Sequence, residues 1–166
     1  MNILELIKKI ESKVYSQNIE EQVVMFLIEH GLTISTAESC TGGMIVSTLI
    51  NVSGSSKVVK ESYVTYANES KIKILGVSEE TINKYSVYSK EVAVEMVQGL
   101  KRITNDDVCI SITGLTDSVQ KGKFDCGIII KDKIYTFNYQ VDGSRNEIRL
   151  KQTKLVLGVL LELLKG

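Results

Sequence analysis

The order in which helical and extended apolar patterns follow one another constrains the fold of this chain more than any other feature. Apolar residues recur at helical spacing in some segments, whereas β-branched and aromatic residues alternate or cluster in the segments between them. We expect helices at 3–14, 23–30, 43–50, 69–75, 89–103 and 144–165, with another beginning at Ser78. We expect strands at 32–36, 58–66, 108–113, 126–131 and 133–141. Helices that alternate with strands, followed by a late hairpin, predict an α/β fold: a three-layer α/β/α sandwich on a mixed β-sheet.

The two ends of the chain raise a question of assembly. The last helix is apolar around most of its girth, because Leu157, Leu161 and Leu164 lie on a different side from Leu155 and Leu160. Such a helix is either deeply buried or part of a subunit contact, and the pattern leaves both open. Residues 1–17 form an expected extra helix that either covers the core or mediates assembly. We therefore expect a homo-oligomer, most simply a dimer.

Length and charge narrow the class of protein. With 166 residues and no internal repeat or linker, residues 1–166 are expected to form one domain. The formal net charge is zero, which gives no electrostatic argument for nucleic acid or a membrane surface as partner. No apolar run reaches the ~18 residues of a membrane span, and the N-terminus lacks the pattern of a signal peptide. A cytoplasmic protein is the expectation.

Few cysteines and one histidine limit the available chemistry. Three cysteines, none in a CxxC pair, indicate reduced thiols rather than a disulfide framework, and several-ligand zinc sites are not expected. His30 precedes Gly31 at an expected helix end, where it suits the negative end of the helix dipole. A Ser-His-Asp triad is therefore not expected, and neither a metal nor another cofactor is implied.

The stretch "STAESCTGG" places polar residues between a strand and a helix, where apolar packing cannot use them. Gly42 and Gly43 allow a sharp turn and a close approach to a ligand. The free N–H groups of a helix start can hold a phosphate or a developing oxyanion. Two interpretations stay open: Ser39 is a nucleophile, or Ser39 or Thr41 merely caps the helix. Cys40 is a weaker nucleophile candidate, because a buried cysteine usually behaves as a small hydrophobe.

A serine nucleophile needs a base, and without a suitable histidine a lysine with a lowered pKa is the natural substitute. The best placed of the many lysines is Lys71 in "VTYANESK", just after an expected strand end and close to Tyr66 and Asn68. The alternative is a solvated lysine on a short helix, since lysine is seldom buried.

The segments "TAESCTGG", "GSS", "VTYANESKIKILGV", "YSKEVAVEMVQG" and "SITG" occur in this order. Together they resemble the C-terminal domain of the competence/damage-inducible protein CinA, a family that includes stand-alone nicotinamide mononucleotide amidases of the PncC type. The resemblance covers about Leu32 to Gly114, with a fainter similarity in "DGSRNEIRLKQT". It implies hydrolysis of the carboxamide of nicotinamide mononucleotide, a pyridine nucleotide, which gives nicotinic acid mononucleotide and ammonia by a metal-free serine–lysine mechanism.

The resemblance also implies residue roles. It makes Ser39 the nucleophile and Lys71 the general base, with Tyr66 assisting, and it places Thr113 in the lining of the pocket. We add the N–H groups near Thr41, Gly42 and Gly43 as an expected oxyanion hole. The remaining candidates for substrate contact are Ser55, Asn68 and Arg145. For Arg145 the alternative is an ordinary exposed arginine in a weak surface ion pair.

One segment departs from the family pattern. After Thr113-Gly114 the family usually carries a Gly-Pro-x-Gly-Gly loop and then a Lys-Pro-Val-Gly segment. This chain instead reads "LTDSVQKGKFDCGIII", in which only Gly127 matches the second segment. A glycine-rich loop would lie against the substrate, so the change bears on affinity and substrate identity. A second hypothesis follows: a catalytically inactive relative that binds a nucleotide or a protein partner.

Overall fold

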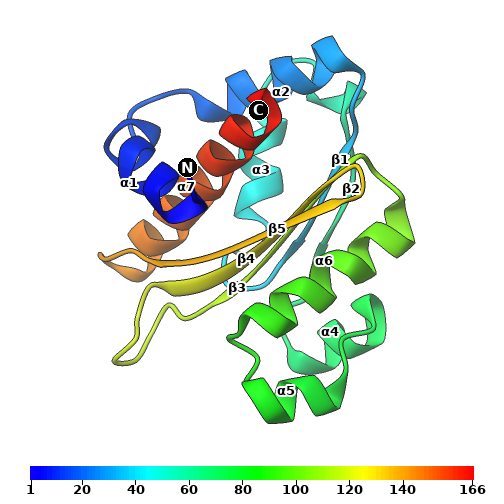
Figure 1. Cartoon of the computed structure of the whole chain (residues 1–166), viewed down its shortest axis with the longest axis vertical. Helices are drawn as coiled ribbons and strands as arrows, with labels where there is room; N and C mark the ends of the chain where they lie inside the picture. Colours follow the sequence, from blue (N-terminus) through cyan, green and yellow to red (C-terminus); the bar gives the residue numbers. More distant parts are fainter.

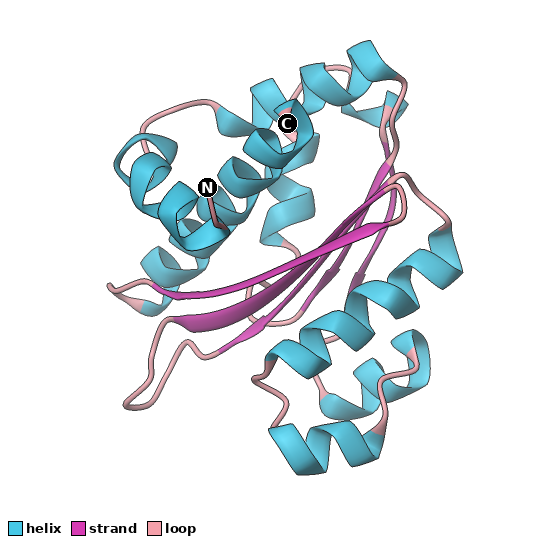
Figure 2. Ribbon diagram, in the orientation of Figure 1, coloured by secondary structure: helices cyan, strands magenta, loops and turns pink.

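The computed structural model describes residues 1–166 and contains one five-stranded sheet in the order β2-β1-β3-β4-β5 (Figure 2). The strands are β1 (Ile34–Glu38), β2 (Val59–Val64), β3 (Val108–Gly114), β4 (Lys123–Ile130) and β5 (Lys133–Gln140). Strand β1 pairs in parallel with both β2 and β3, whereas β4 is antiparallel to β3 and to β5. The predicted mixed sheet and late hairpin are both present.

Helices cover both faces of this sheet (Figure 1). They are α1 (Ile3–Val14), α2 (Ile19–His30), α3 (Met44–Ile50), α4 (Asn68–Leu75), α5 (Glu79–Tyr85), α6 (Lys90–Thr104) and α7 (Arg145–Lys165). Helices α1, α2, α3 and α7 lie on one face, and α4, α5 and α6 lie on the other. The three-layer α/β/α sandwich predicted from the sequence is therefore confirmed.

Each face of the sheet has its own apolar core. The larger core joins the sheet to α1, α2, α3 and α7, and the smaller joins it to α4 and α6. Strand β3 lies in the middle and is buried on both sides, so its polar residues are covered as well as its isoleucines. The hydroxyl of Ser111, for example, donates to the carbonyl of Ala93 on α6 at 2.6 Å, which satisfies it away from water.

The apolar girth of α7 is buried within this chain. Leu157 and Leu161 are no more than 3% exposed, because α1 and α2 both pack on α7. Contact is closest at Gly158, where an added Cβ would come within 2.5 Å of Val14 on α1. Of the two readings of this helix, deep burial accounts for these leucines, and residues 3–14 serve as a cover for α7.

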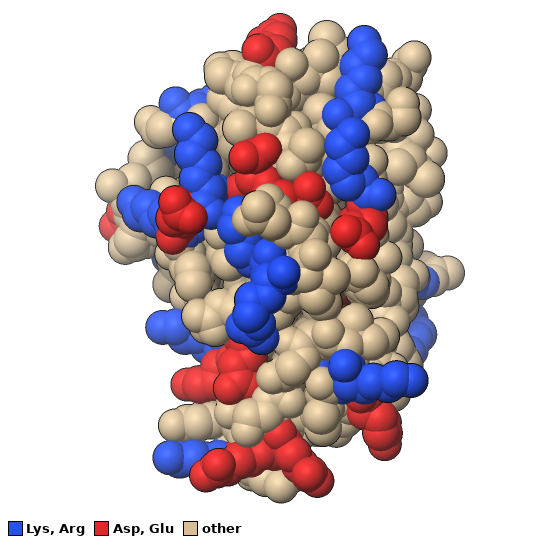
Figure 3. All heavy atoms as spheres, turned by 90° about the vertical axis from the view of Figure 1, so that its right-hand side faces the viewer, with Lys and Arg blue, Asp and Glu red and all other residues tan.

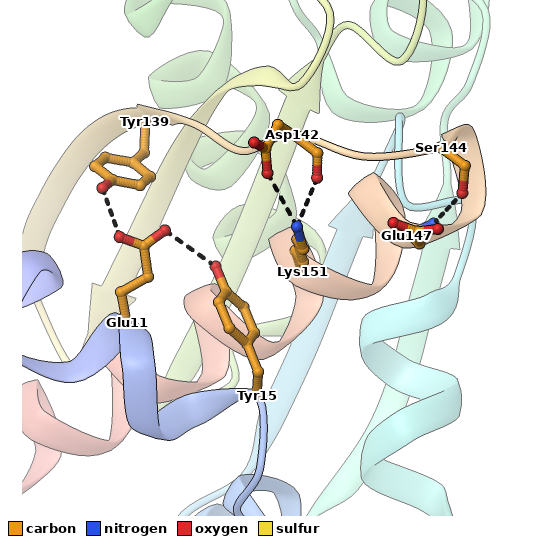
Figure 4. A network of polar contacts seen from close by, with 7 residues as sticks. All are labelled: Glu11, Tyr15, Tyr139, Asp142, Ser144, Glu147 and Lys151. Atoms are coloured by element: carbon orange, nitrogen blue, oxygen red, sulfur yellow. Dashed lines mark hydrogen bonds and ion pairs between the residues drawn. The ribbon is translucent and has the colours of Figure 1, made fainter.

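Polar contacts fix α1 and the start of α7 (Figure 4). The carboxylate of Glu11 accepts hydrogen bonds from Tyr139 of β5 at 2.7 Å and from Tyr15 at 3.3 Å.

At the start of α7, the hydroxyl of Ser144 accepts the N–H of Glu147, as an N-cap residue does. Because Ser144 sets where the helix begins, it also sets the position of Arg145, the first residue of α7.

Several local details are not specified by residue spacing. Ile103 is 44% exposed, because it lies in the last turn of α6 beyond the edge of the core. The segment between α3 and β2 contains a short 3-10 helix, Ser55–Lys57. The hairpin turn between β4 and β5 lacks glycine, and Lys131 itself adopts the left-handed conformation with φ of 57°.

The surface carries both signs of charge. On the face shown in Figure 3, basic and acidic side chains are interspersed, as the balanced composition implies. None of the helices is long and apolar enough to cross a membrane.

Candidate active site

The turn after β1 holds Ser39 at the carboxyl end of the parallel strands. The N–H of Ser39 donates to the carbonyl of Ile112 on β3 at 3.1 Å, which continues the ladder by one residue. The chain then reverses through Gly42 and Gly43, both with positive φ (60° and 94°), before α3 begins. Gly43 is the N-cap residue of α3 and has no side chain to cap it. The alternative reading, in which Ser39 or Thr41 caps this helix, is therefore wrong.

A carboxylate performs the capping instead. Glu38 is fully buried at the end of β1, and its two oxygens accept the N–H groups of Ile45 and Val46 at 2.8 and 3.0 Å. The same oxygens accept the hydroxyls of Thr36 and Thr41 at 2.9 and 2.7 Å. A negative charge at a helix N-terminus is favourable, and the four donors compensate its burial. Glu38 thus leaves the hydroxyl of Ser39 free of any capping role.

Lys71 reaches Ser39 from the other side. Its Nζ lies 2.8 Å from Ser39 Oγ and donates to the carbonyls of Thr65 and Tyr66 at 2.7 and 3.1 Å. Lys71 stands on α4 and is only 1% exposed, so the alternative of a solvated lysine does not hold. Burial disfavours the ammonium form and lowers the pKa of Lys71 to about 8. At this pKa roughly a tenth of the amine is neutral at pH 7, and the neutral fraction increases as the pH rises through 8.

Ser39 and Lys71 open into a cavity of about 240 Å³. Tyr66, Asn68 and Arg145 line it, as do Val87, Tyr88 and the segment Gly114–Ser118. Cys40 also lines the cavity, but burial raises the pKa of its thiol to about 12, so the thiolate is not populated near neutral pH. The structure thus brings five of the sequence-derived candidates to one cavity: Ser39, Lys71, Tyr66, Asn68 and Arg145.

Arg145 lies at the rim of this cavity. Its guanidinium forms an ion pair with Asp117 and donates to the hydroxyl of Tyr66 at 3.2 Å. The hydrogen bond to Asp117 raises the pKa of Arg145, and the guanidinium stays charged. Asp117 belongs to the segment that departs from the family pattern, and nothing in its immediate sequence marked it as a partner of Arg145.

Other candidates lie away from the cavity lining. The hydroxyl of Thr113 donates to the carbonyl of Val87 at 3.0 Å, so Thr113 supports a lining residue but does not line the cavity itself. Ser55 precedes β2, whereas Ser39 follows the parallel strand β1, so the two stand at opposite ends of the sheet. Arg149, which was not a candidate, donates to the carbonyl of Thr41 at 2.8 Å, and neither residue lines the cavity.

The expected oxyanion donors are only partly free. The N–H of Gly42 is used within the turn, where it donates to the carbonyl of Ser39 at 3.0 Å. Thr41, Gly42 and Gly43 do not line the cavity. Cys40 does line it, and its N–H makes no hydrogen bond to a main-chain carbonyl. The amide that follows the nucleophile directly is therefore better placed for this role than the glycines.

Sequence comparison identifies the family of this domain. The family model described as the CinA C-terminal domain matches residues 16–164. The chain belongs to the CinA family. Helix α1 precedes the matched range, while both Ser39 and Lys71 fall inside it.

Curated CinA relatives are longer than this chain. A putative competence-damage inducible protein of Finegoldia magna is 45% identical over 144 residues, which cover 87% of this chain and 35% of that protein. A CinA-like protein of Kosmotoga olearia is 40% identical over 147 residues, 85% of this chain and 36% of the relative. The chain thus spans about a third of the length of these relatives.

Solved CinA structures share the fold over most of their length. A CinA superfamily protein from Escherichia coli has a TM-score of 0.81 and 31% identity, covering 87% of this chain and 90% of its own. A competence/damage inducible protein from Agrobacterium tumefaciens has a TM-score of 0.83 and 30% identity, with 90% and 97% covered.

Within this CinA domain, the segment 115–122 closes as a short loop between β3 and β4. The N–H of Leu115 donates to the carbonyl of Lys123 at 2.8 Å, and the N–H of Gly122 donates to the carbonyl of Leu115 at 2.7 Å. These two bonds anchor the base of the loop, and residues 115–118 face the cavity. The segment that departs from the family pattern therefore lines the cavity.

Proposed function

We propose that this protein is an amidase that converts nicotinamide mononucleotide, or a related pyridine nucleotide, to the corresponding acid and ammonia. The observation that carries the proposal is the 2.8 Å contact between Lys71 Nζ and Ser39 Oγ at the floor of a cavity. A buried amine with a lowered pKa beside a serine hydroxyl is a base paired with a nucleophile. The substrate class comes from the resemblance of the sequence motifs to the nicotinamide mononucleotide amidases of the CinA family.

The chemistry follows from this pair. Neutral Lys71 takes the proton of the Ser39 hydroxyl, and Ser39 Oγ attacks the carboxamide carbon. The protonated amine then gives its proton to the amide nitrogen, the C–N bond breaks, and ammonia leaves an acyl ester on Ser39. Water attacks this ester while Lys71 accepts a proton from the water. Lys71 then returns that proton to Ser39 Oγ as the ester bond breaks, and the acid is released. The carbonyls of Thr65 and Tyr66 hold the amine in line with Ser39 throughout.

Stabilisation of the tetrahedral oxygen falls to main-chain donors. The N–H of Cys40 follows the nucleophile directly, belongs to a residue that lines the cavity and makes no hydrogen bond to a main-chain carbonyl. Loss of one such donor typically costs about 10²–10³ in rate. Glu38 has an indirect, positioning role. It fixes the start of α3 and therefore the turn that contains the Cys40 amide.

The altered loop favours the second candidate, a catalytically inactive relative that binds a nucleotide or a protein. Asp117 in that loop pairs with Arg145, a cation that the substrate phosphate would otherwise meet. The intact geometry of Ser39 and Lys71 favours the amidase, because an inactive relative needs no buried amine against a hydroxyl.

The deciding experiment measures ammonia release from nicotinamide mononucleotide by the wild type and by Ser39→Ala. We expect release by the wild type and a loss of at least about 10³-fold in the variant. Ser47→Ala, which alters a serine on the neighbouring helix α3, is the matched control and keeps wild-type rates. Binding of the nucleotide without release by either protein would replace the amidase with the inactive relative.

A further inference from the structure

The guanidinium of Arg145 places one positive charge at the rim of the cavity, and the carboxylate of Asp117 is already paired with it. Lys71 and Arg145 are the only basic residues that line the cavity, and the amine of Lys71 is held by Ser39 and two carbonyls. Arg145 is paired with Asp117, and the two side chains are 50% and 78% exposed. An anionic group that enters the cavity therefore meets a guanidinium whose charge is already balanced.

The position of Asp117 is set by the loop. The loop is closed at its base by two main-chain hydrogen bonds of Leu115 and Gly122, and Asp117 lies two residues beyond Leu115 on the cavity side. Tyr66 holds the guanidinium from the other side, through the 3.2 Å bond to its hydroxyl. The acid and the base thus come from two separate segments, the loop between β3 and β4 and the first residue of α7, which the ion pair joins.

We propose that Asp117 is a specificity-determining residue that competes with the phosphate of the substrate for Arg145. The inference rests on the proposed function and refines its substrate class. A phosphate dianion must displace the Asp117 carboxylate from Arg145 and then stay near that negative charge. A nucleoside without phosphate has neither obstacle. The wild type therefore distinguishes only weakly between a phosphorylated pyridine nucleotide and its nucleoside.

The test replaces the charge and keeps the shape. Asp117→Asn retains a hydrogen-bond acceptor for Arg145 and removes the negative charge at the rim. We expect the ratio of kcat/KM for nicotinamide mononucleotide to kcat/KM for nicotinamide riboside to rise about five- to tenfold. The gain lies in KM for the phosphorylated substrate, because Asp117 has no hydrogen bond to Ser39 or Lys71 and pairs only with Arg145.

Two further variants locate the effect. Asp142→Asn removes the same charge from another ion pair near the start of α7, that of Asp142 with Lys151 at 3.0 Å, outside the cavity lining (Figure 4). We expect this control to leave the ratio unchanged. In an Arg145→Gln background, Asp117→Asn should no longer raise the ratio, because the cation for which the two anions compete is absent. An equal change in the Asp142 control, or a full effect without Arg145, overturns the inference.

A binding measurement separates this inference from the amidase proposal. Calorimetry on Ser39→Ala and on Ser39→Ala with Asp117→Asn reports affinity for both compounds without turnover. Tighter binding of the mononucleotide alone in the double variant, in a protein whose wild type releases no ammonia, supports the role of Asp117 and rejects the amidase. Ammonia release by the wild type with an unchanged ratio in Asp117→Asn supports the amidase and rejects the role of Asp117. Binding of neither compound by any variant rejects both.

Discussion

The floor and the rim of the cavity are built on different physical principles. The floor consists of Ser39, Lys71 and the two carbonyls that hold its amine, and it is buried and joined by short hydrogen bonds. The rim consists of Asp117, Arg145 and the side chain of Tyr66, which is 61% exposed. Buried hydrogen bonds fix one geometry because their loss leaves unpaired groups, whereas exposed ion pairs contribute little and exchange partners readily.

The contrast indicates where the chain can change its substrate without losing its chemistry. The floor is attached to β1, β2 and α4, whose positions are set by both cores of the sandwich. The rim is attached to a loop and to the first turn of α7. A substitution at the rim therefore alters what enters the cavity, and a substitution at the floor alters whether anything reacts there.

Removal of the amine of Lys71 tests the floor and should change the rate most. Lys71→Met replaces the buried amine with an apolar chain of similar length, and we expect kcat/KM for ammonia release to fall by about 10²–10⁴-fold, the usual contribution of a general base. Lys73→Met makes the same change at an exposed position on the same helix and should leave the rate unchanged. Both proteins are compared after their melting temperatures are measured. A folded Lys71→Met protein with wild-type activity would remove Lys71 from the mechanism.

The next prediction concerns Glu38, whose hydrogen bonds hold the turn that carries Ser39. Glu38→Gln exchanges a carboxylate that accepts four hydrogen bonds for an amide whose NH₂ faces donors. We expect the free energy of unfolding to fall by about 2–3 kcal/mol, measured by urea denaturation. Glu61→Gln, at an exposed carboxylate that accepts only the Tyr63 hydroxyl, should change it little. Equal losses in the two variants would show that Glu38 has no special place beneath Ser39.

Glu38 also illustrates what the sequence could not reveal. The stretch 35–43 predicted a strand, a turn and a helix, because spacing and glycines specify local conformation. It did not predict which side chain caps the helix, since the cap spans Glu38 to Val46 and depends on the turn that the glycines make. A glutamate at the end of a buried strand, just before a helix that lacks Ser, Thr, Asp or Asn at its N-cap, was the available signal.

Contacts between residues far apart in the sequence were likewise only partly predictable. The resemblance to CinA pointed to both Ser39 and Lys71, and the structure places them together. Composition alone could not choose among the many lysines, although Lys71 was the best placed of them. Thr113 and Ser55 came from motifs as well, yet one bonds Val87 and the other stands at the opposite end of the sheet. The pairing of Asp117 with Arg145 joins a loop to a helix 28 residues later, a contact that no local pattern encodes.

The third prediction uses the pH dependence of kcat/KM to distinguish the floor from the rim. Because burial lowers the pKa of Lys71 to about 8, the neutral amine that acts as base increases as pH rises through that value. We expect kcat/KM to be about tenfold lower at pH 7 than on a plateau above pH 9. Asp117→Asn should leave the midpoint of this profile in place, since the rim does not contact the amine. A rate that still climbs steeply at pH 10 would mean that the amine titrates like an exposed lysine.

The smallest effect tests whether the rim is dispensable to the fold. Because the Asp117–Arg145 pair is exposed on both sides, its loss should lower the melting temperature by less than about 2 °C in either Asp117→Asn or Arg145→Gln. High salt should reduce even this difference, as screening weakens exposed charges. Glu38→Gln, with its buried bonds, should keep its larger destabilisation at any salt concentration. If the rim variants instead melted as early as Glu38→Gln, the loop and the start of α7 would be part of the structural core, and substrate selection at the rim could not vary independently of the chemistry at the floor.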